Sequence, residues 1–158
     1  MTEVTETKTI LTKAEVLALV PQQAPFRFID EIIELDDNGI TAAYTWKLDE
    51  SFYEGHFPNN PITPGVVLLE ASAQAGVVAF GIYLAAKAFP KDEISQILTL
   101  FTEAQVEFNG LVKPGQRIIM RAKKIYFRRL KLKVEFETTL EDGTPVCSGT
   151  LAGLGVKS

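Results

Sequence analysis

Apolar and polar residues alternate in two segments of this chain, and each alternating segment predicts a β-strand. In the first, the apolar positions are Ile40, Ala42, Tyr44, Trp46 and Leu48. In the second, the core-facing positions are Leu132, Val134, Phe136, Thr138 and Leu140, and the solvent-facing ones are Lys131, Lys133, Glu135, Glu137 and Thr139. A period of two places successive side chains on opposite faces, which is typical of half-buried antiparallel strands.

The stretch 61–86 between these strands is almost wholly apolar and small, and Glu70 is its only charged residue. Thr63 followed by Pro64 is typical of a helix N-cap and first helical position, so we expect a helix from Pro64 to Ala88 that ends before Pro90. The run exceeds the ~18 apolar residues that indicate a membrane span. Because polar side chains cluster in its first half and no basic cluster flanks it, a buried core helix is favoured.

Further signals complete the predicted architecture. Thr12 and Glu15 have the spacing of a capping box, which predicts a helix over 13–20. The other predicted strands are 26–35, 95–108, 115–127 and 144–154, the second alternating strand spans 130–140, and a turn is predicted at 36–39. The simplest arrangement is an α+β single domain over 1–158, an antiparallel sheet curled around one long helix, with 1–11 as a flexible N-terminus.

Composition excludes several classes of protein. The chain has 158 residues, one cysteine (Cys147) and one histidine (His56). A disulfide framework is therefore excluded, a zinc site is not expected, and Cys147 is expected in the core. The acidic, polar N-terminus shows no signal peptide, so we expect a cytoplasmic protein.

Charge is unevenly distributed along the chain, whose net charge is −4. Residues 1–110 carry 16 acidic and 6 basic side chains, whereas residues 111–133 carry nine basic and no acidic ones. Such a block indicates either an anionic partner or a solvated strand face. The pattern alone leaves both interpretations open.

Three features near the start of the long helix suggest proton-transfer chemistry. Glu70 lies about two turns into an apolar helix, where desolvation favours the protonated acid, and Gln74 follows on the same face. His56 is the one imidazole, and Gly65 leaves the first-turn amides open to a carbonyl oxygen. Each has a structural alternative: a solvated histidine, a solvated carboxylate, a surface glutamine or a tight entry turn. Together they suit removal of a proton next to a thioester carbonyl while a β-hydroxyl departs.

The segment GHFPNNPITPGVVLLEASAQ, residues 55–74, resembles the motif GHFPxxPxxPGxxxxEAxAQ of FabZ-type 3-hydroxyacyl-[acyl-carrier-protein] dehydratases. Weaker likeness extends over roughly 12–155. The resemblance implies a hotdog fold and a homodimer, or a higher oligomer, with active sites between subunits. It implies His56 and Glu70, from different subunits, as the catalytic pair, with Gly65 and Val66 at the thioester carbonyl and Gln74 in the substrate site. No cofactor, metal, nucleic acid or membrane is implied.

The implied partner is an acyl carrier protein. Carrier proteins of this kind are acidic, so the basic block becomes a candidate docking patch formed by Arg121, Lys123, Lys124, Arg128 and Arg129. Alternate strand residues point to opposite faces, so not all five can contribute.

The sequence departs from the family pattern at Asn59, Thr63 and the pair Gln22-Gln23, and residues 105–110 look closer to FabA-type dehydratase/isomerases. Acyl chain length, isomerase activity and a specialised polyene or polyketide pathway therefore stay open. Two alternatives remain: a hotdog acyl thioesterase in which Glu70 activates water, and a non-enzymatic acyl-binding or nucleic-acid-binding module.

Overall fold

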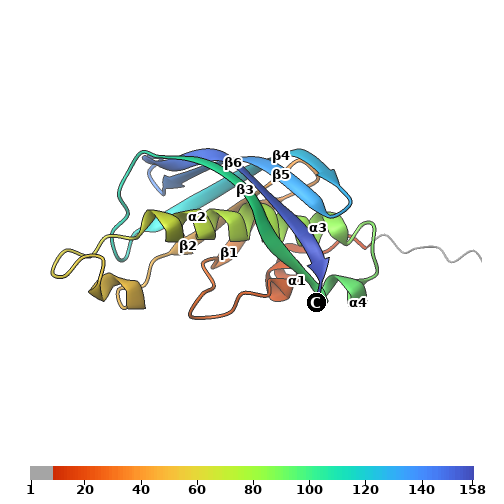
Figure 1. The fold of residues 1–158 in the computed structure, drawn as a ribbon, viewed down its shortest axis with the longest axis horizontal. Coiled ribbons are helices and arrows are strands. Elements are labelled where there is room, and N and C mark those ends of the chain that lie inside the picture. The colour runs from red at the N-terminus through yellow and green to blue at the C-terminus, as the bar shows by residue number, and fades with distance from the viewer. Residues whose placement is uncertain (1–8) are drawn as a thin grey trace, which may run out of the picture.

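A six-stranded antiparallel sheet arches over one long helix in the computed structural model, which describes residues 9–158 (Figure 1). In sheet order the strands are β1 (Glu31–Leu35), β2 (Gly39–Thr45), β4 (Arg117–Arg128), β5 (Lys131–Leu140), β6 (Pro145–Lys157) and β3 (Ile97–Phe108). Strand β3 pairs only with β6 and forms one edge of the sheet. The predicted α+β architecture, the hotdog fold, is confirmed.

The long helix is continuous from Gly65 to Ala85, close to the predicted 64–88. It consists of α2 (Gly65–Ala73), a π-helical segment η2 (Gln74–Ala79) that the sequence did not predict, and α3 (Phe80–Ala85). It is long and apolar enough to cross a membrane, but 67% of its most apolar window is buried inside the protein. It is therefore the core helix of this fold.

Shorter helices surround the core. Helix α1 (Lys13–Leu19) begins with the predicted capping box, in which Thr12 and Glu15 bond each other's backbone amides. A 3₁₀ turn, η1 (Ser51–Glu54), precedes the long helix, and α4 (Lys91–Ile94), which was not predicted, follows it. Residues 1–8 of the predicted flexible N-terminus lie outside the described part, whereas Leu11 is buried in the core.

Four local predictions are corrected by the structure. Strand β1 begins at residue 31 instead of 26, because backbone groups of Phe26 and Phe28 bond the side chain of Gln74 instead of a neighbouring strand. Leu48 lies beyond the end of β2 and is 78% exposed. The N-cap of α2 is Pro64 and not Thr63.

The fourth correction concerns Thr139, which lies among the predicted solvent-facing positions of β5 but is buried. The alternation is otherwise confirmed there: Leu132, Val134, Phe136 and Thr138 are all buried. Cys147 is also buried, and burial raises the pKa of its thiol, so it is the expected core cysteine.

Candidate active site

His56 lies in the loop between η1 and α2, where Ile62 bonds its ring and Phe57 stacks on it. The Nδ1 atom of His56 lies 2.9 Å from the carbonyl oxygen of Ile62, and the Ile62 amide donates to the His56 carbonyl oxygen at 2.9 Å. A carbonyl oxygen only accepts, so Nδ1 carries the hydrogen. The lone pair of the neutral ring is therefore on Nε2, which can act as a base.

A buried pair of hydroxyl groups anchors the loop that carries His56. The Tyr53 hydroxyl and Thr63 Oγ1 lie 2.7 Å apart, and the Thr63 amide donates to the Val112 carbonyl at 2.8 Å. Asn59 has φ 62°, a left-handed conformation that glycine and asparagine adopt most readily. Asparagine therefore suits this position, where the family usually has glycine.

Glu70 lies on α2 with a partly buried carboxyl group. Burial raises its pKa, and a hydrogen bond from Gln74 Nε2 at 3.3 Å opposes this more weakly. The predominance of desolvation means that the neutral acid persists to higher pH than for a solvated glutamate. A carboxyl group in this state can donate a proton.

Gln74 is fully buried, and both ends of its amide are engaged. Its Oε1 accepts from the Phe28 amide and its Nε2 donates to the Phe26 carbonyl oxygen, each at 2.8 Å. Gln74 thus ties the long helix to the segment before β1 while it contacts Glu70. The structure adds this positioning contact, and direct contact between Gln74 and substrate stays a prediction.

The amides of Gly65 and Val66 are open at the start of α2. The Pro64 carbonyl oxygen accepts from Val67 and Leu68, whereas neither Gly65 N–H nor Val66 N–H has an acceptor within residues 9–158. A Cβ atom on Gly65 would lie 3.1 Å from the Phe108 ring, so glycine avoids a tight contact at this position. Free helix N-terminal amides of this kind can polarise a carbonyl oxygen.

A single chain does not assemble these groups into one site. A cavity of about 30 Å³ includes Glu70 among its lining residues but not His56. No hydrogen bond joins the two side chains in the described part of the chain. Within one chain, His56 and Glu70 therefore share neither a cavity nor a hydrogen bond, and each side chain has its own supporting contacts.

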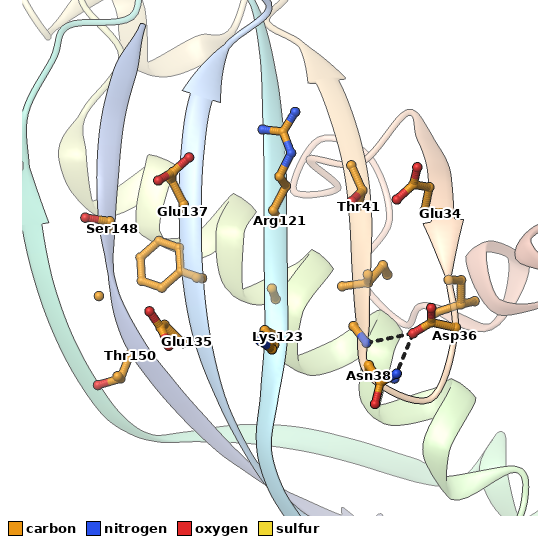
Figure 2. A pocket seen from close by; sticks show the side chains of 16 residues that line it. Glu34, Asp36, Asn38, Thr41, Arg121, Lys123, Glu135, Glu137, Ser148 and Thr150 are labelled. Atoms are coloured by element: carbon orange, nitrogen blue, oxygen red, sulfur yellow. Dashed lines mark hydrogen bonds between the residues drawn. The ribbon is translucent and has the colours of Figure 1, made fainter. Parts of the chain in front are cut away.

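The predicted docking residues are also dispersed. Arg121 and Lys123 lie on the outer face of β4, opposite Glu137 and Glu135 of β5 in the strand register (Figure 2). They line a wide hollow of about 810 Å³ that includes neither His56 nor Glu70.

Arg128 and Arg129 lie instead at the β4–β5 turn. That turn packs near α3 and α4, at the end of the long helix away from Gly65 (Figure 1). Lys124, which is half-buried and opposite Val134 in the register, lies between these two pairs along β4, so the five basic residues do not form one surface beside the helix start.

Sequence reasoning missed the side chains that share the cavity with Glu70. They are Gln22, Ala73, Val77, Val78, Thr99 and Phe101. Gln22 departs from the family pattern, but this departure does not indicate a place in the site. No feature of the sequence indicates that residues from three distant segments meet there. Among the described residues, no group of three His, Cys, Asp or Glu side chains could hold a metal ion.

A sheet wrapped around a helix that carries one desolvated acid, preceded by a loop with one oriented histidine, defines a protein of the hotdog-fold class. The family model described as the FabA-like domain matches residues 20–150. The chain therefore belongs to the FabA-like family.

Two curated relatives are 3-hydroxyacyl-[acyl-carrier-protein] dehydratases FabZ. The protein from Lactococcus lactis subsp. cremoris is 33% identical over 92% of this chain and 95% of its own length. The protein from Petrotoga mobilis is 31% identical over 90% and 96%.

Solved structures share the fold at lower identity. The dehydratase heterocomplex ApeI:P from Xenorhabdus doucetiae matches with a TM-score of 0.75 at 17% identity, over 94% of this chain and 93% of the matched one. A thioesterase from Haemophilus influenzae matches with a TM-score of 0.65 at 16% identity, over 95% and 94%. At such identities these two likenesses show the fold alone.

Proposed function

We propose that this protein is a 3-hydroxyacyl-[acyl-carrier-protein] dehydratase, which converts (3R)-3-hydroxyacyl thioesters into trans-2-enoyl thioesters in the cytoplasm, in fatty-acid or related polyene or polyketide synthesis. The observation that carries the proposal is the desolvated carboxyl of Glu70, held by Gln74 on the core helix. Dehydration requires an acid that can give its proton to the departing hydroxyl, and burial favours the protonated form of Glu70 by raising its pKa.

Each group has a distinct task in the proposed reaction. Nε2 of His56 removes the α-proton, while the amides of Gly65 and Val66 stabilise the negative charge that develops on the thioester oxygen. Glu70 gives its proton to the departing β-hydroxyl, directly or through water. No metal or organic cofactor takes part in these steps.

We propose that the working enzyme is a homodimer, because the edge strand β3 is unpaired on one side and carries apolar side chains outward. Leu98, Leu100, Phe101 and Phe108 on β3 are each at least 41% exposed, and Val66 at the helix start is 74% exposed. Such an edge is rarely left uncovered in a native protein. A second copy on β3 would bring its own His56 toward this chain's Glu70.

An acidic acyl carrier protein is the proposed source of substrate. The arginines of the β4–β5 turn favour this partner, because Arg128 is opposite Lys131 in the register and has no acidic cross-strand neighbour. Arg121 and Lys123, by contrast, already face carboxylates.

The test is an assay with carrier-bound 3-hydroxyacyl substrates of graded length, with products identified by mass and double-bond position. The expected product is a trans-2-enoyl thioester from the wild type, with turnover nearly abolished in His56→Ala and in Glu70→Gln. Normal turnover by either folded variant would exclude the proposed roles.

The same assay separates the alternatives. Release of free thiol without an enoyl product would identify a thioesterase, and a shifted double bond would identify a dehydratase/isomerase. Salt-sensitive RNA or DNA binding without either activity would favour the non-enzymatic module.

A further inference from the structure

The cavity beside Glu70 is large enough for water. Its volume is about 30 Å³, and a buried water needs roughly 10–15 Å³ measured in this way, so about two waters fit. Most of its wall is apolar, and the polar side chains among its lining residues are Gln22, Glu70 and Thr99. A water in this cavity would therefore have few partners, and Glu70 is one of them.

Gln22, one of the lining residues, carries an acceptor without a partner. Its Oε1 is buried and has no hydrogen-bond partner within residues 9–158. Its neighbour Gln23 differs, since Gln23 Nε2 donates to the Val20 carbonyl at 3.0 Å. A buried acceptor without a partner is destabilising, and native proteins mostly satisfy such groups with protein or water.

The position of Gln22 is fixed by the end of the preceding helix. Arg27 Nη2 donates to the Val20 carbonyl at 3.0 Å and also to the Leu17 carbonyl. Val20 itself is buried, and its amide bonds the Leu17 carbonyl at 3.3 Å. Gln22 therefore lies two residues beyond a carbonyl group that two side chains bond, which limits its movement beside the cavity.

We infer that Gln22 receives the water that leaves during dehydration, an inference that rests on the proposed function of this site. The α-proton passes to His56 Nε2, the Cβ–O bond breaks, and the proton of Glu70 joins the departing hydroxyl to form water. That water has two hydrogens. One bonds the Glu70 carboxylate that has just formed, and the other bonds Oε1 of Gln22.

This contact differs in kind from those of Gln74. Gln74 bonds backbone groups at both ends of its amide and positions Glu70, whereas the buried Gln22 oxygen has no hydrogen-bond partner within residues 9–158. In the reverse direction, hydration of the enoyl thioester, Gln22 would hold the attacking water against Glu70. The effect of Gln22 should therefore appear in turnover, with little change in substrate affinity.

The test compares Gln22→Met, which keeps the size but removes the amide oxygen, with the control Gln23→Met at an exposed neighbour. Dehydration and hydration are measured with the full-length protein and carrier-bound substrates. We expect kcat to fall about tenfold in both directions for Gln22→Met, which is the effect of one lost hydrogen bond in the transition state, with KM within about twofold. Gln23→Met removes one bond to the Val20 carbonyl, but Arg27 still bonds that carbonyl, so this variant should match the wild type.

A third variant, Gln22→Glu, gives a readout that a structural role would not move. It keeps an acceptor but adds a negative charge next to Glu70, which raises the pKa of Glu70 further. The high-pH limb of the kcat profile should then move to higher pH.

Three outcomes would overturn the inference. They are unchanged kcat in Gln22→Met, a loss of activity that parallels subunit dissociation in sedimentation, or an unmoved pH limb in Gln22→Glu. If the wild type forms no enoyl product at all, the proposed function fails first and the inference fails with it. If the wild type is active and Gln22→Met is equally active, only the role of Gln22 is lost.

Discussion

The Nδ1 atom of His56 donates to the Ile62 carbonyl oxygen at 2.9 Å, which directs Nε2 away from its own loop. The same two residues are also joined by their backbones, from the Ile62 amide to the His56 carbonyl at 2.9 Å. The imidazole is thus set in one tautomer and one orientation before any substrate arrives. Glu70, in contrast, is oriented from within the helix by Gln74. The two halves of the proposed site have independent supports, which makes them separable by mutation.

Mixing two inactive variants should restore activity if each site uses His56 of one subunit and Glu70 of the other. A heterodimer of His56→Ala and Glu70→Gln chains has one site with both residues intact. Because random exchange makes half of the dimers mixed and each has one good site, we expect about one quarter of wild-type activity. The measurement is enoyl formation after the two variants are denatured and refolded together. Activity no greater than that of the separate variants would contradict a shared site.

Glu70→Gln should also change how stability depends on pH. Burial raises the pKa of Glu70 in the folded protein, so folding favours its neutral form. Neutral Glu70 adds to the free energy of unfolding at pH values below the pKa that Glu70 has in the unfolded chain. This contribution is lost as the pH rises through the higher pKa that Glu70 has in the folded protein. Glu70→Gln should therefore be about as stable as the wild type at pH 4 and more stable at pH 8. Urea unfolding at fixed protein concentration measures this, with Glu54→Gln, an exposed carboxylate, as control. If the variant and the wild type differ in stability by the same amount at pH 4 and at pH 8, this explanation is ruled out.

The sequence predicted the parts of this molecule that depend on local pattern. The capping box of Thr12 and Glu15, the alternation in β5 and the length of the core helix all follow from spacing alone. The acid character of Glu70 was predicted in the same way, because a single carboxyl on an apolar helix must be desolvated.

The features that could not be predicted from the sequence depend on contacts between segments that are distant in the chain. Gln74 meets Phe26 and Phe28 across almost fifty residues, and this contact delays the start of β1. Thr63 has the side chain of an N-cap, but its hydroxyl bonds Tyr53 instead. The position of Gln22 beside Glu70 is of the same kind. None of these pairings leaves a periodic signal.

Thr63→Val should destabilise the protein and lower its activity. Valine has nearly the same shape but leaves the buried Tyr53 hydroxyl without its partner at 2.7 Å, which costs about 1–3 kcal/mol. The loop that carries His56 would lose its anchor at the same time. Thr63→Ser keeps the hydroxyl and should retain most of both properties. Thermal unfolding and kcat of the three proteins decide the question, and a Thr63→Val protein as stable as the wild type would contradict it.

Val77 should set a limit on acyl chain length. The cavity beside Glu70 and a second, apolar cavity deeper along the helix share Val77 and Thr99. The junction is tight, since a Cβ atom on Gly153 would lie 2.4 Å from Val77 Cγ1. Val77→Ala should join the cavities and shift preference toward longer chains, whereas Val77→Leu should shift it toward shorter ones.

The measurement is kcat/KM over a series of carrier-bound substrates. About tenfold changes in the ratio between long and short substrates are expected, the effect of a methylene or two in an apolar pocket. Val16→Ala is the control, because Val16 is equally buried but lines neither cavity. The same shift in Val16→Ala would mean that loosened packing, and not the junction, changes the preference.

Neutralising the β4–β5 turn should weaken carrier recognition more than neutralising the outer face of the sheet. Arg128→Gln combined with Arg129→Asn removes two charges, and asparagine suits the left-handed φ of 48° at position 129. Arg121→Gln combined with Lys123→Gln is the matched variant, with charges that already face Glu137 and Glu135. At low salt we expect KM for carrier-bound substrate to rise about tenfold in the turn variant and to change little in the other, because rim charges that face an acidic partner steer its approach. The effect should shrink at high salt and be absent with a pantetheine thioester that lacks the carrier. A larger effect in the outer-face variant would instead place the carrier on that face.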